Sequence, residues 1–320
     1  MDRRIVHFLL HVPKCAGTSV EGHFRAHLGP GFLLAPRWES PFTNLIGNRY
    51  PYAPDDPRLA PVRVVSGHSL SRSLARHFPG AEIRESVLLR DPVGYFLSFY
   101  NYRWSWHRRG HAPAPPDFER WYRAQRRNPI SRFLLNRYFE HGIPALYRFS
   151  SAGRLAWLEL RLARFWFVGG HERAADLIAG VSAELAVPER SERRNVTEAP
   201  EIARADLGPD WIARIERDNA LDALLHARWR HRGWRADAAV AGLSGKDPAL
   251  GGRPDGASNP AGPVRPPGLA SSGARPDGPQ PKAPGTADEG SGAGGRLPAW
   301  DQPAYIASDL VSGIAKRLIR

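Results

Sequence analysis

The chain has 320 residues and a formal net charge of +13 at pH 7, because 45 Lys and Arg outnumber 32 Asp and Glu. A single cysteine, Cys15, excludes an internal disulfide framework, so the fold does not need an oxidising compartment. The first residues lack the pattern of a signal peptide, and no apolar run reaches the length of a transmembrane span. We therefore expect a cytoplasmic protein.

The first predicted element is a buried strand followed by a tight turn. An apolar run over residues 5–10 predicts the strand, and Pro13 and Gly17 predict the turn after it. The turn is not a Walker A loop, in which Lys directly precedes the hydroxyl residue, because Lys14 comes before Gly17 here.

A helix is expected to begin directly after this turn. Thr18 and Ser19 are predicted to cap it, and apolar spacing continues it to Leu28. The N–H groups of a first helical turn lack helical partners and attract anions. Lys14 adds a positive charge, so the sequence predicts a site for a phosphate or a sulfate ester.

A second strand is predicted over residues 62–66 and ends at Gly67-His68-Ser69. In an open parallel sheet, ligands lie beyond the carboxyl ends of the strands. His68 is therefore expected beside the first loop. An imidazole titrates near neutral pH, so His68 is a candidate base that takes a proton from a hydroxyl. A structural or acceptor-binding role is the alternative for this side chain.

A third strand, over residues 86–89, leads into Arg90 and a further helix. Asp91 is the expected N-cap, and Pro92 suits the first helical position. Ser98 follows within two turns, on a face that looks back to the strand end. The planar fork of Arg90 suits a phosphate, because it donates two parallel hydrogen bonds.

Basic residues gather between positions 103 and 132, interleaved with aromatic residues. The basic members are Arg103, His107, Arg108, Arg109, His111, Arg120, Arg123, Arg126, Arg127 and Arg132, and the aromatic members are Trp104, Trp106, Trp121 and Tyr122. This mixture suits an anionic sugar chain, and a solvated Arg-rich surface is the alternative. No zinc-ligand spacing or nucleic-acid-binding motif accompanies it, so we expect no specific nucleic-acid partner.

Composition predicts three regions. Residues 1–235 are long enough to form one domain with a full core. Residues 236–299, rich in Gly, Pro, Ala and Ser with six basic and six acidic side chains, are expected to be a disordered linker. Because residues 300–320 contribute only +1, a charge of +12 falls to the first domain.

The last region, residues 300–320, predicts a C-terminal amphipathic helix. Within 305–320, apolar residues recur every four positions, at Ile306, Leu310, Ile314 and Leu318. Its basic end favours peripheral contact with the inner surface of a membrane. Docking on a protein surface is the alternative.

Several of these motifs resemble those of one enzyme family. Pro-Lys-x-x-Gly-Thr-Ser resembles the 5′-phosphosulfate loop of sulfotransferases, which use 3′-phosphoadenylyl sulfate (PAPS) as the donor. The Arg90-Asp-Pro segment with Ser98 resembles their 3′-phosphate motif. His68 narrows the resemblance to carbohydrate sulfotransferases of the heparan-sulfate 2-O and 6-O type. Residues 165–173, 193–197 and 215–222 extend it, so it covers roughly residues 1–235.

The resemblance implies an α/β fold with a central parallel sheet flanked by helices on both faces, similar to P-loop kinases. It implies sulfuryl transfer from PAPS to a hydroxyl, without a metal, on an acceptor that we expect to be an anionic glycan. Lys14 and His68 are the implied catalytic residues. The implied donor-binding residues are Pro13, Lys14, Cys15, Ala16, Gly17, Thr18, Ser19, Arg90 and Ser98.

For two side chains near these motifs, Cys15 and Glu172, we favour a structural role over a catalytic one. Cys15 lies beside a helix N-terminus, where a reactive thiol is one reading and a small packing residue the favoured one. Glu172 suits a helix start better than a catalytic acid. Two other functions stay open: a nucleotide-dependent kinase on a related fold, and a non-enzymatic polyanion-binding protein.

Overall fold

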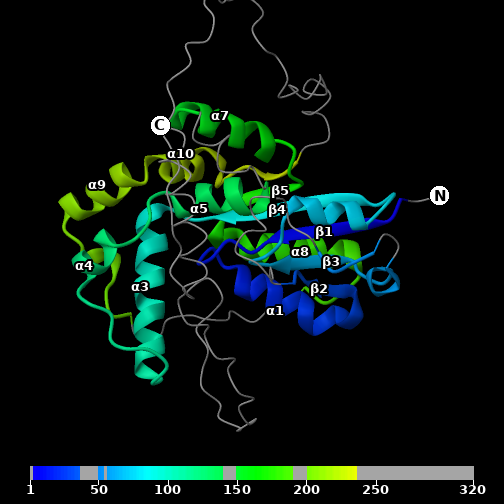
Figure 1. Cartoon of the computed structure of the whole chain (residues 1–320), viewed down its shortest axis with the longest axis horizontal. Helices are drawn as coiled ribbons and strands as arrows, with labels where there is room; N and C mark the ends of the chain where they lie inside the picture. Colours follow the sequence, from blue (N-terminus) through cyan, green and yellow to red (C-terminus); the bar gives the residue numbers. More distant parts are fainter. Residues whose placement is uncertain (1–2, 37–49, 54–55, 140–148, 190–199, 236–320) are drawn as a thin grey trace, which may run out of the picture. The chain divides into compact units, whose positions relative to one another are not determined.

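A computed structural model of the chain describes residues 3–36, 50–53, 56–139, 149–189 and 200–235. Its centre is a six-stranded sheet in the order β2-β3-β1-β4-β5-β6. The strands are β1 (Ile5–Leu10), β2 (Phe32–Leu34), β3 (Val64–Gly67), β4 (Glu82–Leu89), β5 (Phe167–Gly170) and β6 (Gly233–Trp234). The expected α/β architecture with a central sheet is confirmed (Figure 1).

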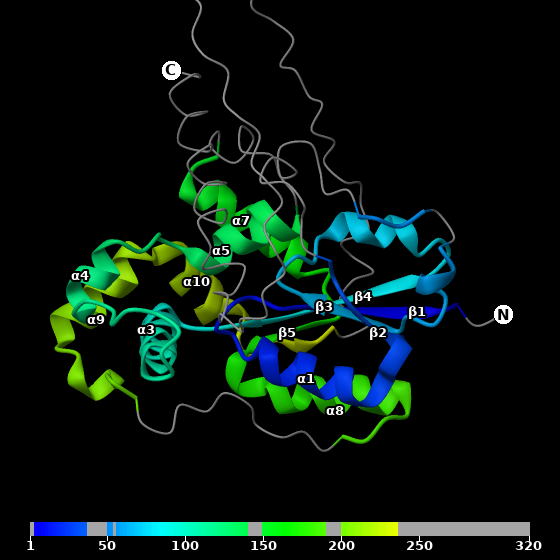
Figure 2. The same ribbon diagram turned by 60° about the horizontal axis from the view of Figure 1, so that its bottom comes forward.

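Helices cover both faces of this sheet. The α-helices of the described ranges are α1 (Gly17–Leu28), α3 (Pro92–Arg108), α4 (Phe118–Arg123), α5 (Pro129–Arg132), α7 (Ser151–Leu162), α8 (Ala174–Leu185), α9 (Pro209–Asp218) and α10 (Ala220–Trp229). Short 3₁₀ turns are η1 (Gly29–Gly31), η2 (Pro57–Leu59), η3 (Arg72–His77), η5 (His171–Arg173) and η6 (Arg204–Asp206), and η4 (Phe133–Tyr138) is a π-helix. In Figure 2, α1 and α8 lie under the sheet, whereas α5 and α7 lie above it.

The strands form where the sequence is apolar enough to be buried on both faces. β1 is buried from Val6 to Leu10, and β4 is buried from Glu85 to Leu89. Such continuous burial is typical of parallel strands covered by helices. The predicted strand over residues 5–10 is confirmed, and the predicted strand over 62–66 is shifted to 64–67.

The sheet departs from the expected parallel arrangement at one edge. β1 to β5 pair in parallel, but β6 runs antiparallel to β5, with Phe167 opposite Trp234. Two residues, Gly233 and Trp234, give too short an apolar run to predict a strand from sequence.

The start of α3 follows the sequence prediction. Asp91 is the N-cap, and its carboxylate accepts a hydrogen bond from the N–H of Gly94 at 2.8 Å. Pro92 occupies the first helical position, where its missing N–H costs nothing. The predicted linker (236–299) and terminal helix (300–320) lie outside the described residues. None of the helices in the described ranges has the length and hydropathy needed to cross a membrane.

Candidate functional site

Three chain segments meet at the carboxyl edge of the sheet. β1 lies between β3 and β4 and is parallel to both, so all three strands end at the same edge. The loop with Lys14 follows β1, His68 follows β3, and Arg90 follows β4. The chain leaves β1 toward β2 and β3 on one side and later crosses to β4 on the other side. Open α/β sheets bind ligands at the point where the strand order reverses in this way.

The loop after β1 has an unusual backbone. Lys14 and Ala16 both have positive φ angles, 62° and 65°, which L-residues rarely adopt. Such left-handed residues in a turn direct successive N–H groups toward one concave side and form an anion-binding nest. Cys15 N–H bonds the carbonyl of Val12 at 3.3 Å, which closes the turn beneath them.

The expected capping role of Thr18 and Ser19 is wrong. α1 begins at Gly17, and its N-cap is Ala16, which has no side chain to cap with. Thr18 and Ser19 therefore lie inside the first turn, Thr18 exposed and Ser19 half-buried. Within the described part of the chain, no hydrogen bond takes up the N–H of Ala16, Gly17 or Thr18. These N–H groups therefore have no backbone partner in the described structure, as is usual in the first turn of a helix.

Pro13 and Cys15 support the loop from below. Pro13 is buried, and Cys15 is 1% exposed. Burial raises the pKa of the Cys15 thiol, more than the nearby Arg90 lowers it. Cys15 is thus a neutral packing residue, as favoured from the sequence, because a reactive cysteine needs an accessible thiolate.

Arg90 connects the end of β4 to this loop. Its Nη1 donates a 2.9 Å hydrogen bond to the carbonyl of Lys14. Its Nε is buried without a hydrogen-bond partner in the described structure, and burial lowers the pKa of the guanidinium. A buried donor without a partner is costly unless a ligand meets it. The Lys14 ammonium lies 4.0 Å from the ring centroid of Tyr102, on α3.

Gly94 makes room for this arrangement. A Cβ at that position would lie 2.6 Å from Asp91 Oδ2 and 3.1 Å from Arg90 Nε. Ser98 is half-buried further along α3, and no hydrogen bond joins it to Arg90 in the described part of the chain. The structure therefore brings together Arg90 and Lys14 and leaves Ser98 apart from their hydrogen bond.

His68 lies beside the loop, as its place in the sequence predicted. Its Nδ1 is 2.8 Å from the carbonyl oxygen of His11. Because a carbonyl only accepts, Nδ1 carries the proton and the lone pair of the neutral ring is on Nε2. The pKa of His68 is lowered to about 3, mainly by burial, then by the neighbouring His11, Arg137 and Lys14. His68 is therefore neutral at physiological pH and has the tautomer of a proton acceptor.

His11 is a member of the site that sequence reasoning missed. Its ring lies 4.0 Å from that of His68 between centroids, and its Nδ1 is 2.8 Å from Glu21 Oε2. Gly17 lets the ring lie there, because a Cβ at Gly17 would be 2.0 Å from His11 Cδ2. The signal was a histidine at the strand end with a carboxylate in the second turn of α1.

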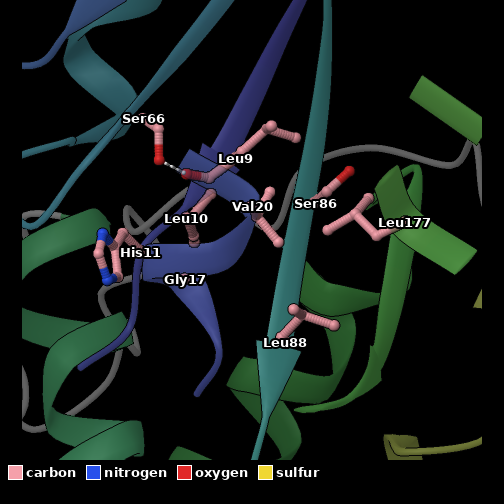
Figure 3. A pocket seen from close by; sticks show the side chains of 9 residues that line it. All are labelled: Leu9, Leu10, His11, Gly17, Val20, Ser66, Ser86, Leu88 and Leu177. Atoms are coloured by element: carbon pink, nitrogen blue, oxygen red, sulfur yellow. Dashed lines mark hydrogen bonds between the residues drawn. The ribbon is translucent and has the colours of Figure 1, made fainter. Parts of the chain in front are cut away.

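A small apolar pocket lies behind the loop. Its lining is mostly leucine and valine, with three polar residues: Leu9, Leu10, His11, Gly17, Val20, Ser66, Ser86, Leu88 and Leu177 (Figure 3). Ser66 donates a 2.9 Å hydrogen bond to the carbonyl of Leu9, and the His11 ring lies beside Gly17. Because its lining is mostly apolar, we interpret the pocket as a gap in the packing beneath the loop.

The late segment contributes a short turn to the same edge. Residues 171–173 form η5 after β5, and Glu172 is exposed in its first turn. His171 Nδ1 lies 3.1 Å from Glu172 Oε2, and burial and then Arg90 lower the pKa of His171. A helix-start role for Glu172 agrees with this position. Residues 193–197 lie outside the described residues.

The basic cluster between positions 103 and 132 is less open than its sequence suggests. Trp121 and Tyr122 are 7% and 0% exposed and pack in the core, so they present no face to a sugar. Arg127 pairs with Asp218 at 3.2 Å and lies over the Tyr122 ring. On α4 the aromatic face beside a guanidinium is thus an internal contact, and Trp121 and Tyr122 are not available to a glycan.

A scan against models of known protein families finds no match for this chain, and a search of curated proteins finds no relative. Among the described residues, no group of three or more His, Cys, Asp or Glu side chains is arranged to hold a metal ion.

Proposed function

We propose that this protein is a PAPS-dependent sulfotransferase that transfers a sulfuryl group to a hydroxyl of a carbohydrate. On this proposal the sheet and its loops form a sulfotransferase fold similar to that of P-loop kinases. The observation that carries the proposal is the contact between Arg90 and the backbone of Lys14, 2.9 Å long. Through this contact Arg90, at the end of β4, lies against the loop after β1 that carries Lys14. The N–H groups of that loop are donors that could bind an anion.

A nucleotide with phosphates at both ends of the ribose fits these two cations. Lys14 and the N–H groups of the nest would hold the 5′-phosphosulfate. Arg90 would hold the 3′-phosphate, with its buried Nε supplying a further donor. Charge-assisted hydrogen bonds of this kind are roughly twice as strong as neutral ones.

The chemistry follows from the tautomer of His68. Nε2 takes the proton of the acceptor hydroxyl while the hydroxyl oxygen attacks sulfur in line. The bond between sulfur and the phosphate oxygen breaks, and 3′-phosphoadenosine 5′-phosphate leaves. Lys14 and the nest N–H groups stabilise the charge that develops on the leaving phosphate.

Burial is the main cause of the low pKa of His68, and neighbouring cations add to it. Lys14 and Arg137 face His68 and disfavour its protonated form. A bound donor brings several negative charges next to these cations, which raises the basicity of His68. Donor binding would therefore offset the part of the lowered pKa that Lys14 and Arg137 cause.

The acceptor that we propose is an anionic glycan. The first 235 residues carry +12, and Arg109 and Arg120 are exposed near α3 and α4. A kinase is disfavoured because the loop lacks the order of a Walker A motif, in which Lys directly precedes the hydroxyl residue. A purely polyanion-binding protein would not need the Nδ1–H tautomer of His68.

Calorimetry tests the donor site. We expect micromolar binding of 3′-phosphoadenosine 5′-phosphate and much weaker binding of ATP, which lacks a 3′-phosphate. Loss of a charged hydrogen bond costs about 1.5–3 kcal/mol, so Arg90→Ala should weaken binding by ~10- to 100-fold. Arg164→Ala removes a half-buried arginine of the loop after α7 and is the control. Equal affinity for ATP would exclude the proposed donor, and radiolabelled PAPS with a panel of glycans then tests transfer.

A further inference from the structure

His11 and Glu21 form a carboxylate–imidazole pair directly beside His68. His11 Nδ1 donates a hydrogen bond to Glu21 Oε2 at 2.8 Å, and the other carboxylate oxygen accepts one from Arg25 at 2.6 Å. The side chains of His11 and Glu21 are only 8% and 16% exposed. Burial raises the pKa of Glu21, but the hydrogen bond from His11, the charge of His11 and Arg25 together hold it below its ordinary value. Glu21 is thus a carboxylate.

His11 touches His68 with both its main chain and its side chain. Its carbonyl accepts the Nδ1 proton of His68 at 2.8 Å. Its ring lies against that of His68, with 4.0 Å between centroids and 39° between planes. Gly17 fixes the His11 ring from below, since no Cβ fits there. The three side chains Glu21, His11 and His68 therefore form one contiguous chain from α1 to the loop after β3.

The charges around His68 determine how stable its protonated form is. Burial opposes a positive charge on His68 most, and the charges of His11, Arg137 on η4 and Lys14 in the loop oppose it further, whereas the hydrogen bond to the His11 carbonyl favours it. Glu21 brings a negative charge to Nδ1 of His11, 2.8 Å away, and so offsets the effect of a charge on His11. A carboxylate within about 4–6 Å of a titrating group shifts its titration by 1–3 pH units, and less with one ring between.

We propose that Glu21 and His11 are positioning residues of the transfer site, through which the Glu21 carboxylate stabilises the charge that His68 gains from the acceptor hydroxyl. This inference rests on the proposed function. In the step, the acceptor O–H bond breaks and an N–H bond forms at His68 Nε2, while sulfur passes from the phosphate oxygen to the acceptor oxygen. Glu21 and His11 exchange no atoms with the substrates.

The test is the pH profile of kcat for Glu21→Gln, measured with PAPS and the best acceptor found for the wild type. Removal of the negative charge favours neutral His68, so the acid limb should move to lower pH by about one unit. Because a weaker base transfers the proton less readily, kcat on the plateau should fall by ~10-fold. Binding of 3′-phosphoadenosine 5′-phosphate should stay near that of the wild type.

Glu119→Gln is the matched control. Glu119 pairs with Arg123 at i,i+4 on α4, as Glu21 pairs with Arg25 on α1, but it has no histidine partner in the described structure. Its profile should be unchanged. His11→Asn keeps a donor for Glu21 but removes the ring, and it should lower plateau kcat at least as much as Glu21→Gln while donor binding persists.

A measurement without turnover checks the starting geometry. Long-range ¹H–¹⁵N spectra should show His68 as the Nδ1–H tautomer, and an Nε2–H tautomer of His68 would overturn the proposal. An unshifted acid limb in Glu21→Gln, with intact donor binding, would overturn it as well and leave the sulfotransferase function standing. A wild type that neither binds 3′-phosphoadenosine 5′-phosphate nor transfers sulfate would instead refute the function itself.

Discussion

The Nδ1 hydrogen bond of His68 to the His11 carbonyl gives its replacement a specific consequence. His68→Ala should lower kcat by ~10²–10⁴, because it removes the base, while the affinity for the donor stays near wild type. His77→Ala is the matched control, since His77 also bonds a backbone group, at Ala53, and burial likewise lowers its pKa. Steady-state transfer assays and calorimetry measure the two quantities. A variant that keeps most of its turnover would place the base elsewhere.

At the residue scale, the sequence predicted the site residues that directly follow strands. It did not predict the contact between His11 and Glu21, which lie ten residues apart on different elements. His68 and Arg90 follow predicted strands, so their common edge followed from the parallel sheet. The partnership of His11 with Glu21 depends on how the His11 ring passes over Gly17. Both residues are visible in the sequence, at the strand end and in the second turn of α1, but the approach of the ring to Gly17 is a tertiary contact. The burial of Trp121 and Tyr122 has the same origin, because it depends on α9 and α3 packing around α4.

At the scale of elements, the first turns of α3 and α7 provide a matched pair of glycines. Gly94 and Gly153 both occupy the third helical position and both donate their N–H to the N-cap, Asp91 or Ser150. A Cβ at Gly94 would lie 2.6 Å from Asp91 Oδ2, whereas a Cβ at Gly153 would meet its nearest atoms at 3.5 Å. The two glycines thus share a position and a hydrogen bond but differ in the room beside them.

We therefore expect opposite effects of the same substitution. Gly94→Ala should lower the free energy of unfolding by about 1–3 kcal/mol, because the cap and the Arg90 side chain must move. Gly153→Ala should raise it by up to about 1 kcal/mol, because Ala suits a helix better than Gly. Urea unfolding measures both changes. Equal effects at the two positions would show that Arg90 and Asp91 adapt without cost.

Elements with strong local signals were predictable, and those shaped by strain were not. β1 and the Asp91–Pro92 start of α3 follow from burial and capping chemistry. The start of α1 does not, because Ala16 in a left-handed conformation replaces the expected hydroxyl cap. A non-glycine residue adopts that conformation only when its surroundings impose it. Here Cys15 and Pro13 pack beneath the loop and hold it in place.

At the scale of the whole molecule, two buried histidines predict a dependence of stability on pH. The pKa of His7 is lowered to about 3 by burial, then by Arg84 and Arg63, and that of His68 to about 3 by burial, then by His11, Arg137 and Lys14. Below pH 6.5 the unfolded chain binds protons at both, and the folded protein binds none until about pH 3. Stability present above pH 6.5 is thus lost on acidification, by up to about 1.4 kcal/mol per pH unit for each histidine.

Asp222 opposes part of this loss. Burial raises its pKa to about 6 against hydrogen bonds from Ser131 and Ile130, so between pH 6 and 3.8 the folded state binds the extra proton. We expect His7→Phe to reduce the loss of unfolding free energy between pH 6.5 and 4.5 by up to about 1.4 kcal/mol per pH unit, the contribution of one histidine. The phenyl ring would keep the contact with Trp166. Urea unfolding at successive pH values measures the slope. A slope equal to that of the wild type would show that His7 is protonated in the folded protein.

The last described residues, 233–235, pack onto the sheet, and the domain boundary expected at Arg235 stays a prediction that truncation tests. β6 pairs with β5, and the N–H of Arg235 donates a 2.7 Å hydrogen bond to the carbonyl of Trp166. The Trp234 ring lies 4.5 Å from those of Trp166 and Phe167, and a Cβ at Gly180 would be 2.3 Å from it. Residues 233–234 therefore add the last strand of the described sheet, and Trp234 packs against the middle of α8 at Gly180.

A chain that ends at Arg235 should consequently fold, keep its melting temperature and bind 3′-phosphoadenosine 5′-phosphate as the full chain does. A chain that ends at Arg232 loses β6 and the large apolar surface of Trp234, so it should melt at a clearly lower temperature. If residues 305–320 bind lipid, only the full chain should sediment with anionic vesicles. Loss of donor binding on truncation at Arg235 would mean that residues beyond it contribute to the site, because the sheet and its loops would remain intact.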